Sequence, residues 1–90
     1  IPSLVRSIGT SAFEGCKSLN LVLLPKSLKS IGNFCFKNCC SLEEIDFPVS
    51  FKSVGYSAFE GCSSLFLISI PYSVELDETG IDENVEVDRF

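Results

Sequence analysis

The sequence contains no histidine and no methionine, and its basic residues are few. Histidine is the commonest general base in enzymes and a frequent metal ligand, so its absence argues against both kinds of site. No apolar run approaches the roughly 18 to 20 residues that a membrane-spanning helix needs. The first six residues also lack the basic segment and long apolar stretch of a signal peptide. We expect neither a membrane anchor nor a signal peptide within these residues, and the lack of methionine suggests a piece of a longer protein.

Charge is distributed unevenly along the chain. The 90 residues carry 7 basic and 12 acidic side chains, a net charge of −5. Up to residue 74 the two signs nearly cancel, with 6 basic and 5 acidic residues, whereas residues 75–90 contain 7 acidic residues and Arg89 as the single base. The basic residues form no cluster in the sequence, and nucleic-acid binding depends on neutralising phosphates. We therefore expect no nucleic-acid partner.

Prolines at a constant spacing mark an internal repeat: Pro2, Pro25, Pro48 and Pro71. The same spacing relates apolar, glycine, phenylalanine, cysteine and serine-leucine positions throughout the chain. Hydrophobic residues make up 46% of the sequence, which is enough for a core in a single domain. So much agreement at one period, without an insertion, predicts a solenoid of about three rungs.

Each rung has two sides that the residue pattern predicts. Residues 19–25, 42–48 and 65–71 are short, rich in bulky apolar residues and stopped by proline, as strands are. Their spacing stacks them as a parallel sheet, at roughly 4.8 Å per rung. A second apolar cluster follows each proline and ends in glycine. It predicts a second side to the coil, with a further short strand.

A turn position in each rung is filled by Gly15, Asn38 and Gly61. Glycine and asparagine best tolerate a positive φ, so we expect a left-handed turn residue there. The residues just before it predict one short helical turn. That turn drives a phenylalanine into the coil, which predicts a stacked column of Phe13, Phe36 and Phe59.

These repeats resemble the BspA-like leucine-rich repeat family, most clearly at residues 57–65 (Ser-Ala-Phe-Glu-Gly-Cys-Ser-Ser-Leu) and 68–74 (Ile-Ser-Ile-Pro-Tyr-Ser-Val). The sequence departs from the family pattern at Cys35 and Cys40. The resemblance implies a leucine-rich-repeat solenoid, mainly β, of stacked parallel short strands with turns and short 3-10 or helical turns. It also implies a surface or secreted adhesion protein with a protein partner, such as a host surface or matrix protein.

The resemblance covers residues 1–74, which we interpret as part of a longer array, and it fades over residues 75–90. Residues 77–82 do not fit the spacing of an EF-hand calcium loop. Residues 85–88 alternate apolar and acidic side chains as a half-buried strand does. The pattern favours an acidic, divergent last rung or cap, with a flexible linker as the alternative.

Cysteines at one repeat position, Cys16, Cys39 and Cys62, are expected to stack inward as free thiols. A disulfide between rungs is within geometric reach, but equal side-chain directions and an odd count of 5 cysteines disfavour it. Cys40 is expected to be exposed and is the best candidate for a reactive thiol. Zinc ligation by Cys35, Cys39 and Cys40 would need a thiol from the buried ladder, so we expect no metal and no cofactor.

The outward positions of the three predicted strands are the candidate binding residues: Asn20, Leu21, Leu23, Glu43, Glu44, Asp46, Phe66, Leu67 and Ser69. Equal spacing should place Leu21, Glu44 and Leu67 in one row. A second row of Leu23, Asp46 and Ser69 should lie beside it. A stripe of carboxylates between two apolar strands favours binding of a basic, partly apolar protein segment. Alternatively, other rungs, the tail or a neighbouring chain cover these side chains.

The sequence offers no catalytic equipment. There is no Gly-x-Ser-x-Gly nucleophile motif, and nothing predicts a pocket that would shift the pKa values of the neighbouring carboxylates apart. We interpret the chain as a noncatalytic protein-binding or adhesion module. Two alternatives stay open: a structural spacer within a larger repeat protein, and an intracellular adaptor, whose reducing compartment would suit stacked, odd-numbered thiols.

Overall fold

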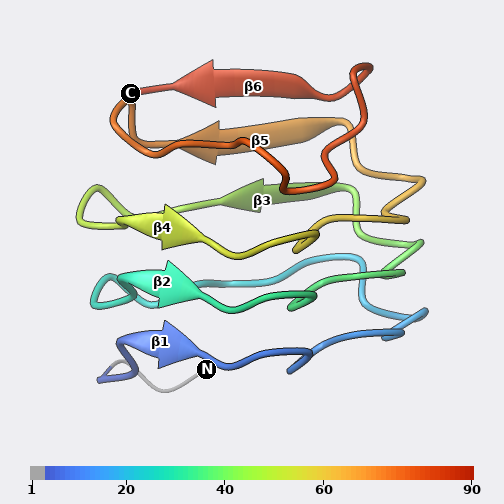
Figure 1. Cartoon of the computed structure of the whole chain (residues 1–90), viewed down its shortest axis with the longest axis horizontal. Helices are drawn as coiled ribbons and strands as arrows, with labels where there is room; N and C mark the ends of the chain where they lie inside the picture. Colours follow the sequence, from blue (N-terminus) through green and yellow to red (C-terminus); the bar gives the residue numbers. More distant parts are fainter. Residues whose placement is uncertain (1–3) are drawn as a thin grey trace.

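The computed structural model describes residues 4–90, which form a coil of stacked rungs with a parallel sheet on each of two sides (Figure 1). Pro2, the first of the repeated prolines, lies outside the described residues. One sheet contains β1 (Ser7–Ile8), β2 (Ser30–Ile31) and β4 (Ser53–Val54). The other contains β3 (Glu44–Asp46), β5 (Leu67–Ile70) and β6 (Glu86–Arg89). Residues 4–90 contain no helix.

The register of the first sheet follows the sequence period. Ser7 pairs with Ser30, which pairs with Ser53. On the other side of the coil, the pairing of β3 with β5 brings Ile45 beside Ile68, which are also one period apart. The predicted parallel solenoid and its second side are therefore confirmed.

The predicted strand at residues 19–25 is mostly absent. Its pairing with the next rung is reduced to an isolated bridge between Leu21 and Glu44. No described strand flanks this segment on its other side, so its pairing depends on β3 alone. After Leu21 the segment is no longer paired with β3. The strands expected at residues 42–48 and 65–71 form, but over fewer residues.

The core contains the predicted phenylalanine column. The rings of Phe13 and Phe36 have centroids 5.3 Å apart and lie within 3° of parallel. Phe36 and Phe59 follow at 5.7 Å and 8°. The column is possible because the chain reverses just after each ring, where the left-handed conformation predicted for Gly15, Asn38 and Gly61 is observed, with φ of 75°, 63° and 78°.

The predicted helical turn is present only as a single hydrogen-bonded turn in each rung, as in the bond from the Glu14 N–H to the Ser11 carbonyl oxygen. Ser11, Phe34 and Ser57 each have a positive φ, which interrupts helical geometry shortly before the core phenylalanine of each rung. The turn does not continue into a helix, because alternate amides bond to the neighbouring rung while those between them bond within the turn. The Phe13 N–H donates to the Cys35 carbonyl at 2.8 Å. Bonding between rungs therefore takes every second donor that a helix would use internally.

Successive rungs approach most closely at a glycine column. A Cβ built on Gly55 would lie 2.3 Å from the carbonyl carbon of Gly32, and one on Gly32 would lie 2.6 Å from the Thr10 nitrogen. Glycine recurs at this position because no side chain fits between the two backbones.

All five cysteines carry free thiols. Cys39 and Cys62 are buried, and each thiol donates to the carbonyl oxygen of a phenylalanine one rung earlier: Cys39 to Phe13 at 3.0 Å and Cys62 to Phe36 at 3.1 Å. Cys16, at the first rung, is half-buried. The predicted inward stacking of these thiols is confirmed. The hydrogen bond from each buried thiol to the preceding rung was not predicted.

Cys40 is half-buried, which corrects the expectation that it is exposed. The equivalent residues in the flanking rungs, Lys17 and Ser63, are both exposed. Cys40 belongs to the middle rung, so the chain covers it from both sides.

The acidic segment after residue 74 leads into β6, which pairs in parallel with β5 (Figure 1). The register runs from Leu67 with Glu86 to Ile70 with Arg89, an offset shorter than the repeat period that relates Glu44 to Leu67. The Arg89 guanidinium donates from Nη1 to the carbonyl oxygens of Pro71, Tyr72 and Val74, at 3.1, 3.4 and 2.6 Å. These bonds join the last strand to the turn that follows β5.

Candidate functional site

The outward side of the β3-β5-β6 sheet, together with residues 20–23 of the first rung, is called the strand face below. Pairing of Leu21 with Glu44 and of Glu44 with Leu67 produces the predicted row. The second predicted row is observed for Asp46 and Ser69. No backbone pairing joins Leu23 to Asp46 among residues 4–90, although both line one hollow.

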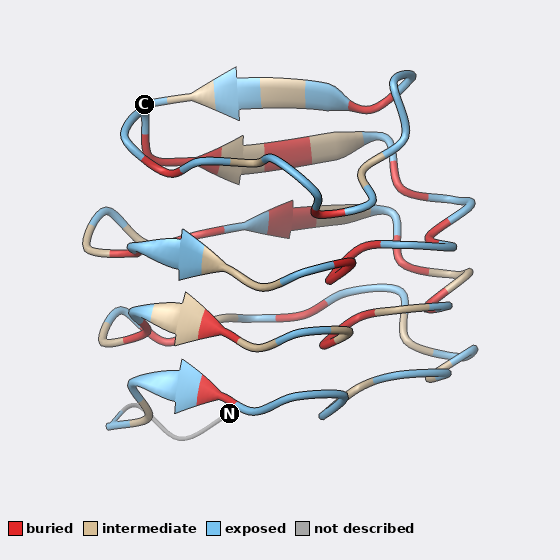
Figure 2. Ribbon diagram, in the orientation of Figure 1, coloured by how far each residue is buried: buried red, intermediate tan, exposed pale blue. Residues whose placement is uncertain are grey.

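The strand face displays large apolar side chains. Leu21 is 55% exposed, Leu23 78% and Phe66 54%, whereas Leu67 is half-buried. Inward residues between them, such as Ile68, form the core, and Figure 2 shows this alternation along β5. The tail adds a strand at the edge of the sheet and leaves these side chains exposed, so it does not cover them (Figure 1).

Acidic side chains occupy alternate rungs of the strand face. The polar residues predicted for this face differ in exposure. Three are exposed, namely Asn20, Glu43 and Asp46, and two are half-buried, namely Glu44 and Ser69. β6 contributes two further acidic residues that the sequence analysis did not place there. Glu86 continues the row of Leu67, and Asp88 continues the row of Ser69. The alternating pattern of residues 85–88 predicted a strand. Its register could not be predicted, because its offset from β5 is shorter than the repeat period.

The rungs of the strand face thus alternate in chemistry. Going along the stack, an apolar rung is followed by an acidic rung, then by a second apolar rung and a second acidic one. Within residues 4–90 one ion pair is found, between Lys37 Nζ and Glu60 Oε2 at 3.5 Å, and it lies away from this face. The acidic groups of the strand face therefore have no basic partner at salt-bridge distance within the described chain.

A hollow of about 150 Å³ opens between the first two rungs of the strand face. Its lining consists of Leu21, Val22, Leu23, Leu24, Glu44 and Asp46. The hollow lies where the ladder fails after the Leu21–Glu44 bridge. It combines an apolar wall with two carboxylates.

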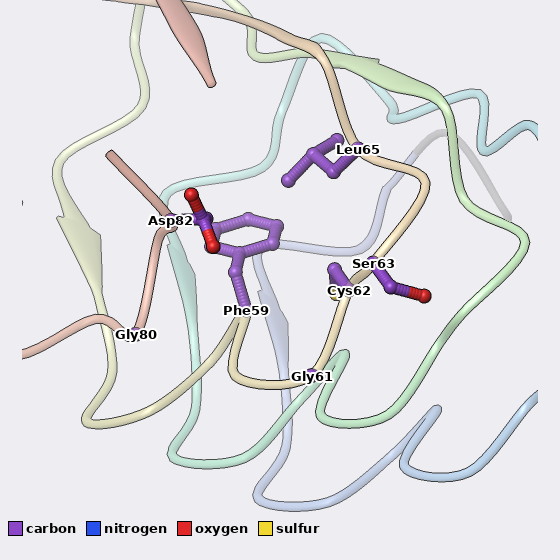
Figure 3. Close-up of a pocket in the computed structure, with 7 residues that line it drawn as sticks. All are labelled: Phe59, Gly61, Cys62, Ser63, Leu65, Gly80 and Asp82. Atoms are coloured by element: carbon purple, nitrogen blue, oxygen red, sulfur yellow. The ribbon is translucent and has the colours of Figure 1, made fainter. Parts of the chain in front are cut away.

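A second hollow, of about 160 Å³, lies near the carboxyl-terminal end (Figure 3). The short last rung leaves it between the Phe59 to Leu65 corner and the Gly80 to Asp82 segment. The Cys62 thiol is in its lining, but burial raises the pKa of that thiol to about 12. A thiol that stays protonated is a poor nucleophile, so the Cys62 thiol is not activated in this hollow.

Two further thiols have the same character. Burial also raises the pKa of Cys35 to about 12 and that of Cys39 above its ordinary value. Residues 4–90 contain no group of three or more cysteine, histidine or acidic side chains placed to hold a metal ion. In the same residues, no helix has the length and apolar character to cross a membrane.

The stacked parallel rungs define a leucine-rich-repeat solenoid. Residues 1–83 match the family described as BspA type leucine-rich repeat region, with 6 copies, and the chain belongs to this family. The repeats are those of a protein-interaction module. The family is typically noncatalytic, and its members are often surface or secreted proteins.

A solved structure is similar in fold. It is the crystal structure of a leucine-rich repeat protein from Bacteroides ovatus ATCC 8483, with a TM-score of 0.76 and 24% sequence identity. The similarity covers 93% of this chain and 28% of that chain, so the present chain spans just over a quarter of the length of that protein. Among curated proteins, none matches this sequence.

Proposed function

We propose that this chain is a noncatalytic protein-binding module of a cell-surface or secreted adhesion protein, and that it binds its partner through the strand face. The observation that carries the proposal is the alternation of exposed apolar rungs with acidic rungs. Large exposed apolar side chains gathered on one face favour a contact site. Acidic side chains without internal partners select a basic, partly apolar protein segment.

Family membership supports the adhesion role and the surface location that we propose. The strand face supports the binding role, because a regular solenoid presents equivalent side chains at constant spacing along an extended partner. Residues 75–90 supply the second acidic rung. We infer that they also cap the repeat array.

The test is capture of host surface and matrix proteins by the chain and by two variants. In the Leu21→Ser, Leu67→Ser variant, partner capture should be lost while the circular dichroism spectrum is unchanged. The matched control is Val49→Ser, because Val49 is 83% exposed but belongs to a turn outside the strand face. Equal capture by all three proteins, or equal loss in the control, would overturn the proposal. A chain that captures nothing would favour a structural spacer.

A second candidate function rests on the five free thiols. An intracellular adaptor would keep them reduced in its own compartment. Thiol titration of denatured protein, isolated without reductant from its native source, separates the two candidates. Five free thiols favour the adaptor, and fewer favour an oxidising, extracellular environment.

A further inference from the structure

We propose that the hollow lined by residues 21–24, Glu44 and Asp46, called the β3 notch below, receives an arginine side chain of the partner. The inference rests on the proposed function, because it assigns one contact within the strand face. It goes further by naming the side chain and the rung pair that recognise it.

The notch exists because the backbone ladder opens at this rung pair. Between the second and third rungs, the Phe47 N–H donates to the Ser69 carbonyl oxygen at 2.8 Å. Between the first and second rungs, the equivalent donor and acceptor are Leu24 and Asp46, and no such bond joins them in the described chain. The two segments separate beyond Leu21, which leaves about 150 Å³ between them.

The lining of the notch matches a side chain that is apolar along its stem and cationic at its tip. Leu21 and Leu23 are exposed and offer contact to methylene groups. Glu44 and Asp46 stand on the opposite wall, in the adjacent strand. Lysine and arginine both pack their stems on apolar surface while the charged group reaches polar partners.

Arginine fits this wall better than lysine. Its planar guanidinium presents several N–H donors in a fixed fork, so it can bond to carboxylates on one strand simultaneously. The lysine ammonium is a compact, strongly hydrated charge, and it loses more hydration for fewer directed bonds. We therefore expect a preference for arginine at the notch.

The fold contains an internal control for charge. Glu86 and Asp88 form a second acidic pair on the same face, beside Leu67 and Ser69. Four consecutive register pairs hold β5 and β6 together, so this rung pair does not open as the first one does. If charge alone determined binding, both acidic pairs would bind the probe equally.

The experiment titrates the isotopically labelled 90-residue chain with N-acetyl-arginine amide and follows its amide resonances. Saturable shifts should appear at residues 21–24 and 44–46. The Glu44→Gln, Asp46→Asn variant should weaken binding about tenfold, whereas Glu86→Gln, Asp88→Asn should retain it. N-acetyl-citrulline amide, a neutral analogue of the same shape, should not bind, and N-acetyl-lysine amide should bind more weakly than the arginine probe.

Any one of four results would overturn the notch assignment. The arginine probe could cause no saturable shift, or shifts of equal size at both acidic pairs. Binding could be weakened equally in both variants, or the citrulline probe could bind as well as the arginine probe. These results are separable from failure of the proposed function. If the arginine probe does not bind but partner capture is still lost in Leu21→Ser, Leu67→Ser, the strand face binds protein through other contacts. If the probe binds and capture is unaffected by that variant, the proposed function fails.

Discussion

The guanidinium of Arg89 donates a hydrogen bond of 2.6 Å to the carbonyl oxygen of Val74. Three repeats earlier, the equivalent carbonyl is that of Val5, and it accepts a 2.6 Å hydrogen bond from the Ser27 hydroxyl of the following rung. At the last rung the arginine thus takes the place of a serine. One side chain satisfies carbonyl groups that the next rung would otherwise bond.

Replacing Arg89 with alanine should therefore destabilise the carboxyl-terminal rung. Three carbonyl contacts are lost, and hydrogen bonds from charged groups contribute about 1.5 to 3 kcal/mol each before solvent exposure reduces that value. We expect the free energy of unfolding to fall by about 1 to 3 kcal/mol in urea titrations. Lys52→Ala, at an exposed position, is the control and should change stability by less than about 0.5 kcal/mol. An unchanged midpoint for Arg89→Ala would contradict this role.

Removal of the central ring of the phenylalanine column should be more damaging than removal of the ring at its amino-terminal end. Phe36 is fully buried and stacks against a ring on each side. Phe36→Ala should cost about 3 to 5 kcal/mol, a large part of the stability of a small domain. Phe13 is half-buried, so Phe13→Ala should cost clearly less. Thermal unfolding compares the two variants, and equal losses would show that the column does not act as one core.

A methyl group at the close approach of two rungs should be far more costly than the same group at the open end of the glycine column. Gly55→Ala places a Cβ about 2.3 Å from a backbone carbon, so the rungs must separate. We expect a loss of at least about 2 kcal/mol in denaturant unfolding. Gly9 belongs to the same column but has nothing within 4 Å of its Cβ position, so Gly9→Ala should be tolerated. Similar effects at the two glycines would refute the close packing.

Stability should fall above pH 9 because of the buried thiols. Burial raises the pKa of Cys35 and Cys62 from 9.0 to about 12, so the folded state holds protons that the unfolded state releases. Each thiol then contributes a decline of up to about 1.4 kcal/mol per pH unit between pH 9 and 12, and none below pH 9. Urea unfolding at pH 8, 9 and 10 measures the slope.

The Cys35→Ala, Cys62→Ala variant provides the comparison for that slope. It should be less stable than the parent chain at pH 8, and its stability should decline less between pH 9 and 10. Parallel declines for the two proteins would exclude these thiols as the source.

The constant repeat period was sufficient to predict the register of the solenoid, because equal spacing without insertions brings equivalent residues into one column. The same spacing predicted the row of Leu21, Glu44 and Leu67 and the stacked phenylalanines. The expected helical turn is limited to one hydrogen-bonded turn in each rung for a physical reason. Positive φ at Ser11, Phe34 and Ser57 interrupts helical geometry, and alternate amides bond to the neighbouring rung.

The repeat period could not predict the register of the last rung or the presence of the β3 notch. The offset of β6 from β5 is shorter than one repeat, so the period could not place Glu86 and Asp88 beside Leu67 and Ser69. The hollow next to Glu44 depends on where a backbone ladder ends, and residues 19–25 have the composition of a continuous strand. Arg89 pairs with Ile70 and has no arginine equivalent in the earlier rungs, so its bonds to the preceding turn could not be predicted from the repeat pattern.

The central claim is that an acidic and apolar strand face binds the partner. The measurement that tests it most directly is the affinity of a captured partner for two charge-matched variants. Glu44→Lys, Asp46→Lys reverses the charge on the strand face, and Glu75→Lys, Asp77→Lys makes the same change in net charge outside it. We predict that the first variant weakens binding about tenfold or more, because like charges then meet, and that the second binds as the parent chain does. Equal affinities for both variants would contradict the claim.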